Sequence, residues 1–308
     1  MKLSIIVPVY NEEGIINEFH KVLSEVLDDI SYEVIYINDG SIDKSKRMLD
    51  EIYLNDKKHV KVLSFSRNFG KDAAIYAGIV EASGEYTCLI DSDLQQHPKY
   101  IFRMLDFLEH NKDYDEMCMI QAGTKKRGFA KLFYRLISKM SNMKFIEGAS
   151  DFRMFNRSVK SAVLSLSEKI RFSKGIFSYI GFNIYYEPYK VSKRTTGTSK
   201  FNFKNKFKYA FEGIVGYSTM PLRLATYTGI ITSLSAFIYL VVTIVKTLVY
   251  GINTPGYASI ICIVLFLGGV ELLCTGILGE YLAKTYIEVK NRPVYILKEK
   301  KGFDDNVL

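Results

Sequence analysis

The residues best suited to chemistry are Asp91, Asp93 and Gln95. They directly follow Tyr86–Ile90, an apolar run typical of a β-strand. Alternate side chains of an extended chain share a face, so the three can present oxygen atoms on one side if the extended path continues. Two carboxylates and an amide suit a hard cation such as Mg²⁺, which takes a few protein oxygens and completes its shell with substrate phosphates. The alternative is a solvated strand end, because carboxylates avoid burial.

The elements that would position these residues alternate between strand and helix patterns. Strands are expected at Leu3–Val9, Glu33–Ile37, Val60–Phe65 and Tyr86–Ile90, and helices at Ile15–Ile30, Asp43–Tyr53 and Asp72–Ala82. Such alternation predicts an α/β fold with a mostly parallel, Rossmann-like sheet flanked by helices. Ligands of these sheets bind beyond the carboxyl ends of the strands, where Asp39 and Asp91 both lie. We therefore expect them to share one cleft. The turn after the first strand lacks the Gly-x-Gly-x-x-Gly pattern that holds a dinucleotide.

Five motifs occur in an order that resembles the family 2 glycosyltransferases of GT-A fold. They are Pro-Val-Tyr-Asn-Glu-Glu at 8–13, Asn-Asp-Gly-Ser at 38–41, Ser-Arg-Asn-Phe-Gly at 66–70, Asp-Ser-Asp-Leu-Gln at 91–95 and Ala-Ser-Asp-Phe-Arg at 149–153. More narrowly, the chain is similar to polyprenyl-phosphate glycosyltransferases, which include dolichol-phosphate mannose synthase and the bacterial bactoprenol glucosyltransferases. The bacterial branch is matched by three further features: two long, almost uncharged runs near the C-terminus, Gly-Glu-Tyr-Leu at 279–282 and Arg-Pro at 292–293. The resemblance therefore covers nearly the whole chain.

The resemblance implies a nucleotide-sugar site at the first strand ends. Its residues would be Pro8, Tyr10, Glu12, Asp39 and Asp91, with Asp39 on the base or ribose. A turn with a helix cap is the alternative for the Asp-Gly-Ser sequence that begins at Asp39. The preceding residue is asparagine where relatives often have aspartate, and an amide still donates and accepts hydrogen bonds.

The resemblance also implies a metal and a catalytic carboxylate. Asp93 and Gln95, with Asp91 nearby, would bind Mg²⁺ or Mn²⁺ on the donor diphosphate and stabilise the leaving group. Asp151 matches the family's catalytic base. A lipid phosphate has a second pKa near 6, by analogy with phosphorylated side chains, so Asp151 can act mainly by orienting the acceptor. An ion-paired loop residue is the alternative for Asp151.

An anionic acceptor requires cations. By resemblance, the acceptor phosphate would be bound by five residues: Arg127, Arg153, Arg194, Ser199 and Lys200. Arginine supplies bidentate geometry and lysine a point charge. Lys125 stands where relatives commonly have arginine, which weakens the expectation of bidentate binding there.

Two long runs predict a membrane hairpin. Ala225–Val245 has no charged residue, and Tyr257–Gly279 has only one. At about 1.5 Å per residue each run reaches roughly 30 Å as a helix, the thickness of a bilayer core. Buried core helices are the alternative. Basic residues flank the outer ends of the runs, so both termini are expected in the cytosol, at the plasma membrane. The N-terminus runs directly into an expected strand, and no cleavable signal peptide is expected.

The chain is thus divided into four expected regions: a cytosolic catalytic domain at 1–200, an amphipathic interfacial segment at 201–223, the two-span hairpin at 224–283 and a cytosolic tail at 284–308. Lysines alternate with aromatic residues in the interfacial segment, as suits anionic lipid headgroups. The net charge of +8 would also fit a nucleic-acid surface, but the two spans argue against nucleic acid as a partner. The four cysteines have no paired spacing, so no disulfide or zinc site is expected.

The expected function is transfer of a single sugar, with inversion, from a nucleotide sugar to polyprenyl (undecaprenyl) phosphate. Uridine is the nucleoside expected for the bacterial branch, and a downstream flippase and an extracytoplasmic transferase would use the product. The resemblance also implies a homo-oligomer, a tetramer. A processive polysaccharide synthase is one alternative, but its Gln-x-x-Arg-Trp motif is excluded because the chain has no tryptophan. A non-catalytic membrane protein that binds nucleotide sugars is the other.

Overall fold

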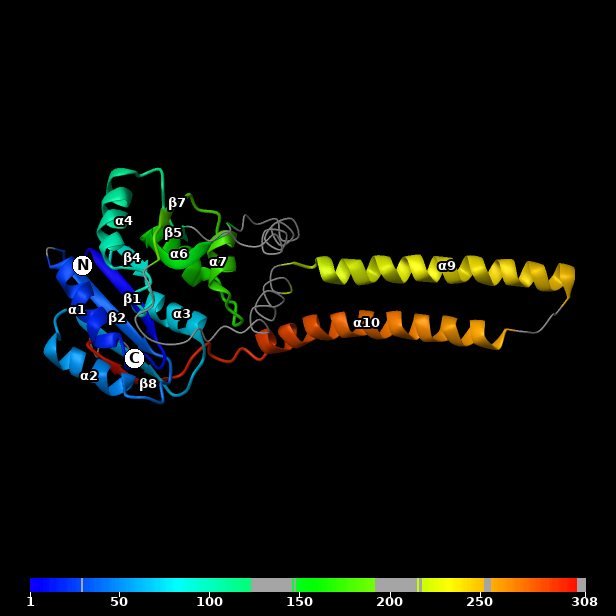
Figure 1. The fold of residues 1–308 in the computed structure, drawn as a ribbon, viewed down its shortest axis with the longest axis horizontal. Helices are drawn as coiled ribbons and strands as arrows, with labels where there is room; N and C mark the ends of the chain where they lie inside the picture. The colour runs from blue at the N-terminus through cyan, green and yellow to red at the C-terminus, as the bar shows by residue number, and fades with distance from the viewer. Residues whose placement is uncertain are drawn as a thin grey trace. The chain divides into compact units, whose positions relative to one another are not determined.

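The computed structural model describes residues 1–28, 30–122, 146, 148–191, 215, 218–251 and 256–303. The chain forms two compact units. One comprises Met1–Ser138, Met143–Phe203 and Arg292–Leu308, and the other Lys139–Asn142 and Lys204–Asn291 (Figure 1). Each unit is described separately below.

A mixed β-sheet forms the centre of the first unit. Within the described ranges its strand order is β7-β5-β6-β4-β1-β2-β3-β8. The strands are β1 (Leu3–Val9), β2 (Tyr32–Asn38), β3 (Val60–Phe65), β4 (Tyr86–Leu89), β5 (Glu116–Gln121), β6 (Ala149–Asn156), β7 (Ile184–Tyr189) and β8 (Leu297–Lys301). Strands β4, β1, β2 and β3 run parallel, whereas β6 is antiparallel to both β4 and β5, and β8 is antiparallel to β3. The predicted α/β fold with a mostly parallel sheet is confirmed.

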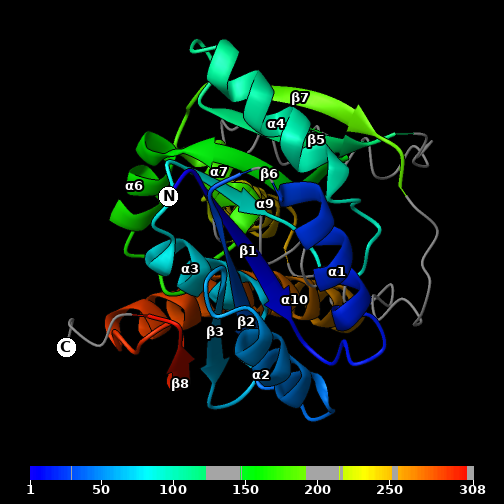
Figure 2. The same ribbon diagram turned by 90° about the vertical axis from the view of Figure 1, so that its left-hand side faces the viewer.

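Helices cover both faces of this sheet (Figure 2). They are α1 (Ile16–Leu27), α2 (Ser45–Asn55), α3 (Lys71–Glu81), α4 (Lys99–His110), α6 (Arg157–Ser165) and α7 (Ser173–Tyr179). The apolar residues of α1 recur every three or four positions, and this stripe, which includes Phe19 and Leu23, is buried with the side chains of β1. On α3, Gly78 allows a close approach to β1, because a Cβ there would lie 2.4 Å from Ile6 Cγ2. The central strands β1 and β2, which are buried along nearly their whole length, therefore have a hydrophobic layer on each side.

The second unit contains the two helices expected from the uncharged runs. Helix α9 spans Met220–Tyr250 and α10 spans Tyr257–Val289. They lie antiparallel, with Cys274 Sγ 3.6 Å from the Ala225 carbonyl and Tyr281 donating to the Ser218 carbonyl at 2.5 Å (Figure 1). Both are long and apolar enough to span a bilayer, and none of their most apolar stretch is buried by protein. Soluble core helices would be buried, so the pair fits a membrane-associated protein.

The C-terminal tail contributes a strand that the sequence did not lead us to expect. After α10, the chain returns to the first unit and Leu297–Lys301 pairs with β3 as the edge strand β8. Residues 297–301 of the tail are therefore part of the same sheet as the strands that lead into the motifs at 38–41, 66–70 and 91–95.

Candidate active site

The loops that follow β1 and β2 are joined by hydrogen bonds. The backbone N–H of Asn11 donates to Ser41 Oγ at 3.1 Å, and the N–H of Ile42 donates to Asn11 Oδ1 at 2.9 Å. Asn11 has a left-handed backbone, with φ of 55°, which asparagine tolerates better than most residues. Asn38 Oδ1 accepts from the Ser41 N–H at 3.0 Å, so the amide performs an acceptor role that an aspartate would also fill. The two motifs thus form one ledge at the carboxyl ends of the strands.

Asp39 holds the next motif against this ledge. Its two carboxylate oxygens accept from the N–H groups of Phe69 and Gly70, at 2.7 Å and 3.0 Å. Burial raises the pKa of Asp39, while these two hydrogen bonds and the charge of Arg67 act in the opposite direction. Gly40 has φ of 64°, and a Cβ there would lie 2.3 Å from the Arg67 carbonyl carbon, so only glycine fits. Asp39 therefore fixes the position of the loop at 66–70.

The Asp91–Gln95 segment is a turn. Strand β4 ends at Leu89, and Leu94 has a left-handed backbone with φ of 54°. The condition under which the three side chains would share one face, an extended path through this segment, is not met, because the turn breaks the alternation of side chains. The polar groups are instead held by local hydrogen bonds. The Gln95 N–H donates to Asp93 Oδ1 at 3.1 Å, and Gln96 Nε2 donates to Asp91 Oδ2 at 3.2 Å.

Lys71 links this turn to Asp151. Its Nζ lies 2.6 Å from Asp91 Oδ1 and 2.8 Å from Asp151 Oδ2. The sheet register explains the meeting. Leu89 of β4 is paired with Arg153 of the antiparallel β6, so Asp91, two residues beyond Leu89, comes to the same end of the strand pair as Asp151, which lies two residues before Arg153 in β6. Lys71 is the first residue of α3, directly after the loop that Asp39 holds. One continuous set of contacts therefore joins Asp39, Lys71, Asp91 and Asp151.

The charges around Asp151 keep it ionised. Burial favours the neutral acid, but the charges of Lys71, Lys174 and Arg153 together hold the pKa of Asp151 well below its usual range. Burial also disfavours the ammonium of Lys71, and the charges of Asp151 and Asp91 outweigh it, so the pKa of Lys71 is raised. Asp151 is thus a carboxylate, and Lys71 an ammonium, at neutral pH.

Lys174 reaches this site from α7. The helix is anchored by Asp72 of α3, which accepts hydrogen bonds from both the N–H and the hydroxyl of Ser173. Lys71 directly precedes Asp72 in sequence, and Lys174 directly follows Ser173. The hydrogen bonds between Asp72 and Ser173 therefore hold together the two segments that carry these lysines. Neither lysine was singled out from the sequence, and the only available signal was the position of Lys71 directly after the Ser-Arg-Asn-Phe-Gly motif.

Arg153 lies in a buried ion pair. Its Nη1 donates to Glu116 Oε1 at 2.8 Å and its Nη2 to the Ser150 carbonyl at 3.1 Å, and its guanidinium stacks on Phe177. Burial raises the pKa of Glu116 to about 7, against the charge of Arg153. The sequence did not indicate this partner. The predicted contact of Arg153 with an acceptor phosphate stays a prediction.

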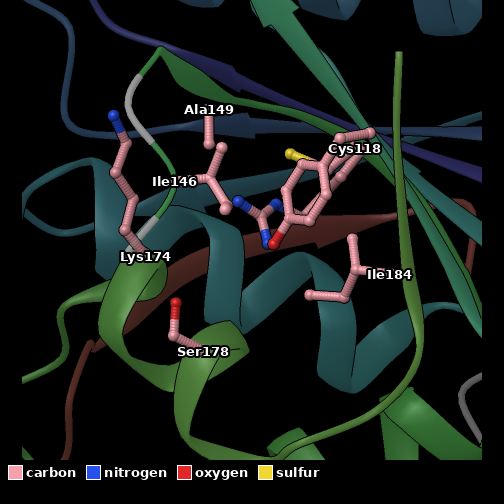
Figure 3. Close-up of a pocket in the computed structure, with 8 residues that line it drawn as sticks. Cys118, Ile146, Ala149, Lys174, Ser178 and Ile184 are labelled. Carbon is pink, nitrogen blue, oxygen red and sulfur yellow. The ribbon is translucent and has the colours of Figure 1, made fainter. Parts of the chain in front are cut away.

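A small cavity adjoins Arg153 (Figure 3). It is lined by Cys118, Ile146, Ala149, Arg153, Lys174, Ser178, Ile184 and Tyr186. Its volume of about 20 Å³ suffices for a water molecule and is too small for a phosphate group.

The remaining predicted residues fall into two groups. Pro8 is in β1 opposite Ile37, and Tyr10 and Glu12 are in the loop that follows, where the Glu12 N–H donates to Ser45 Oγ at 2.8 Å. The predicted acceptor residues Arg127, Arg194, Ser199 and Lys200 lie outside the described residues, as does most of the predicted interfacial segment at 201–223.

The turn at 91–95 offers donors that fit a divalent cation. Within the described ranges, no three histidine, cysteine, aspartate or glutamate side chains are grouped closely enough to hold a metal. Asp91, Asp93 and Gln95 supply two carboxylates and one amide, a hard oxygen set that would leave coordination positions for phosphate oxygens. This donor set suits Mg²⁺ or Mn²⁺ bound together with a diphosphate rather than a metal held by protein alone.

Comparison with known proteins agrees with this geometry. Residues 4–165 match the family described as glycosyl transferase family 2, and residues 220–285 match the family described as GtrB C-terminal hairpin. The Bacillus subtilis protein named "Putative glycosyltransferase CsbB" is 41% identical over 305 residues, covering 96% of this chain and 91% of that protein. The SfII prophage-derived bactoprenol glucosyl transferase of Shigella flexneri is 40% identical over 309 residues, covering 97% and 98%.

A solved structure shares the fold. It is the glucosyl-3-phosphoglycerate synthase of Mycobacterium tuberculosis in complex with Mn²⁺, uridine diphosphate and phosphoglyceric acid. The TM-score is 0.52 at 16% sequence identity, over 70% of this chain and 76% of that one. At this identity the likeness concerns the fold alone.

Proposed function

The chain belongs to glycosyl transferase family 2, and from this premise we propose that it transfers one sugar from a uridine nucleotide sugar to polyprenyl phosphate. The observation that carries the proposal is the meeting of Asp91 and Asp151 at Lys71, in a chain that also has two helices long and apolar enough to cross a membrane. Asp91 lies in the donor motif and Asp151 in the motif expected to face the acceptor. A lipid acceptor explains why the catalytic unit is joined to two apolar helices. The full-length similarity to a bactoprenol glucosyl transferase supports the same acceptor.

The donor would bind along the ledge made by the β1 and β2 loops. Pro8, Tyr10, Glu12 and Asp39 are the proposed nucleoside residues. Asp91, Asp93 and Gln95 would hold Mg²⁺ or Mn²⁺, which offsets the charge of the diphosphate and stabilises it as a leaving group. The Mn²⁺ and uridine diphosphate of the mycobacterial synthase, which has the same fold, support this choice of ion and nucleotide.

In the proposed reaction an oxygen of the lipid phosphate attacks the anomeric carbon. The bond from that carbon to the nucleoside diphosphate breaks as the new bond forms on the opposite face, so the configuration inverts. Asp151 stays ionised, because Lys71 and Lys174 depress its pKa. Its role is to orient the acceptor, whose phosphate is already largely deprotonated at neutral pH. Lys71 would hold Asp151 in place while contacting the donor side through Asp91.

The acceptor phosphate needs positive charge near Asp151. Lys174 is suitably placed, and Arg127, Arg153, Arg194, Ser199 and Lys200 remain the residues proposed from the family motifs. Two anionic substrates repel each other, so cations between them lower the barrier by electrostatic stabilisation.

The proposed location is the cytosolic leaflet of the plasma membrane. Basic residues flank the outer ends of α9 and α10, which favours a cytosolic catalytic unit and both termini on the same side. A flippase and an extracytoplasmic transferase would then use the sugar-lipid in cell-envelope glycosylation. We also propose a homo-oligomer, on the family resemblance.

The product distinguishes this function from the two alternatives. Membranes containing the protein are incubated with undecaprenyl phosphate and a panel of labelled sugar nucleotides, and the product is identified by mass. We expect a lipid phosphate carrying one sugar. A polymer would indicate a polysaccharide synthase, and bound nucleotide sugar without any product would indicate a non-catalytic binding protein.

A further inference from the structure

The segment that leaves the membrane hairpin packs directly beneath a loop of the active site. The Ser66 N–H donates to the Ile296 carbonyl at 3.0 Å, immediately before β8 begins. From there β8 runs antiparallel to β3, with Phe65 opposite Leu297 and Val62 opposite Lys301. The register shifts between Ser64 and Phe65, so the pairing changes where the loop at 66–70 departs.

Aromatic rings extend this contact into the loop. The Tyr295 ring is stacked on Phe65, with centroids 5.0 Å apart and an angle of 13° between the planes. The edge of Phe65 in turn meets Phe69, at 5.7 Å and 89°. Tyr295 also meets Tyr76 of α3, at 6.3 Å and 67°. Tyr295 therefore touches both the strand that enters the loop and the helix that leaves it.

Salt bridges connect the rest of β8 with helices α2 and α3. Lys300 pairs with Glu81 of α3 at 2.9 Å, and Lys301 pairs with Asp50 of α2 at 2.8 Å. Glu299 pairs with Lys46 of α2 at 2.8 Å. Partly exposed pairs of this kind contribute little free energy, so their main effect is to hold the register of the strand. The specific contact with the active-site loop is thus the one made by Tyr295.

The loop at 66–70 connects Asp39 with Lys71 of the candidate active site. The N–H groups of Phe69 and Gly70 donate to Asp39, and the next residue, Lys71, contacts Asp91 and Asp151. Gly70 has φ of 98° and open space where a Cβ would lie. The turn is held from other positions, by the Asp39 carboxylate and by Arg67, whose guanidinium lies over the Phe69 ring. The rings of Phe65 and Phe69 are the loop's aromatic contacts with the sheet, and Tyr295 covers the first of them.

We propose that Tyr295 is a positioning residue of the donor site, through which the tail that follows the membrane hairpin holds the loop at 66–70. The inference rests on the proposed function, which assigns Asp39, the hydrogen-bond partner of this loop, to the nucleoside. It adds that the loop at 66–70 needs a segment more than 220 positions away in sequence, beyond both long apolar helices. Without the Tyr295 ring the loop loses its outer support, and Asp39 and Lys71 lose their fixed spacing.

The test uses the full-length protein in detergent with Mn²⁺ and uridine diphosphate as the probe. Tyr295→Ala removes the ring, and Tyr295→Phe keeps it. Ile296→Ala is the matched control, because its side chain is 53% exposed and its carbonyl still accepts from Ser66. We expect the Kd to rise roughly three- to tenfold for Tyr295→Ala, in line with the loss of an aromatic pair, and to stay near wild type in the other two.

A second variant and a second measurement keep the test decisive. Tyr295→Leu keeps an apolar side chain under β3, so it guards against a Tyr295→Ala variant that fails to fold. Hydrogen exchange at the amides of Phe69 and Gly70 needs no ligand, and we expect it to become faster in Tyr295→Leu but not in Ile296→Ala. A folded Tyr295→Leu protein with wild-type Kd and unchanged amide protection would overturn the inference. If the wild-type protein fails to bind the probe, the proposed function fails, and the exchange rates still decide whether Tyr295 holds the loop.

Discussion

Lys71 and Asp151 form an ion pair, with Nζ 2.8 Å from Oδ2, although they are 80 positions apart in sequence. The same ammonium lies 2.6 Å from Asp91. The pair connects the first turn of α3 with β6, which are brought together because β6 lies antiparallel beside β4. The carboxylate expected at the acceptor is therefore held by a cation that also contacts the donor motif.

Replacing Lys71 should change the titration of Asp151. Lys71 is the first of the positive charges that lower the pKa of Asp151, so Lys71→Met should raise that pKa. The acceptor phosphate, with a second pKa near 6, sets the acid limb of kcat/KM, so the rise is measured on the carboxyl group itself by infrared pH titration of the folded protein. At neutral pH we expect kcat/KM to fall roughly 100-fold, because Asp151 and Asp91 lose the cation that holds them.

Lys71→Arg is the matched control, because it keeps the positive charge. We expect most of the activity to return and the pKa of Asp151 to lie near that of the wild type. An unchanged Asp151 pKa in Lys71→Met would contradict the role assigned to this ion pair.

Asp39→Asn should loosen the loop at 66–70. Only one side-chain oxygen would remain for the N–H groups of Phe69 and Gly70, and the new amide would place a donor against a donor. An unsatisfied buried donor costs about 1–3 kcal/mol, so both thermal stability and uridine diphosphate affinity should fall. Asp113→Asn, at an exposed position, should change neither. Wild-type nucleotide affinity in Asp39→Asn would argue against placing Asp39 in the donor site.

Alanine substitutions at Gly40 and Gly181 should lower the free energy of unfolding by different amounts, because only one of the two sites is crowded. Both have a left-handed backbone, with φ of 64° and 73°, but only at Gly40 would a Cβ strike the neighbouring backbone, at 2.3 Å. Gly181→Ala should cost about 1 kcal/mol of unfolding free energy from the conformation alone. Gly40→Ala should cost about 2–4 kcal/mol, because the loop at 66–70 must also shift. Thermal unfolding of the two variants measures the difference, and equal losses would show that the close approach is unimportant.

Lys174→Ala should weaken acceptor binding more than donor binding. Lys174 acts on Asp151 from α7, on an element distinct from the donor loops. Losing one charge-assisted contact should raise the KM for polyprenyl phosphate roughly tenfold and leave the KM for the nucleotide sugar near wild type. The exposed Lys21→Ala of α1 serves as the control. A rise confined to the nucleotide-sugar KM would place Lys174 on the donor side instead.

The sequence predicted the elements well wherever apolar periodicity was strong. The expected helix at Ile15–Ile30 and strand at Val60–Phe65 correspond to α1 and β3. In both, the spacing of apolar residues along the sequence is enough to show which side chains are buried. At 91–95 the sequence left the extended path as a condition, and the structure has a turn there, because nothing in the apolar pattern signals the left-handed backbone of Leu94. Strand β8 was missed for a related reason. Its sequence, Leu-Lys-Glu-Lys-Lys, is mostly charged, and only its partner β3 makes it a strand.

The predicted site residues show the same division. Asp39, Asp91 and Asp151 stand in motifs that could be recognised from their order along the chain, although no one of these motifs is specific by itself. Lys71 and Lys174 gain their significance from contacts between distant segments, which residue spacing does not reveal. The partnership of Arg153 with Glu116 likewise depends on the register between β5 and β6.

The most direct test of the proposed function compares the wild type with Asp93→Asn in a lipid-labelling assay. Purified full-length protein is given a labelled uridine nucleotide sugar, undecaprenyl phosphate and Mn²⁺, with a chelator in a parallel sample. We predict labelled lipid phosphate carrying one sugar from the wild type, and none from the chelated sample or from Asp93→Asn. Undiminished labelling in the metal-free sample and in Asp93→Asn would contradict the metal–diphosphate site at 91–95, and absence of labelled lipid with every sugar nucleotide would contradict the proposed transfer itself.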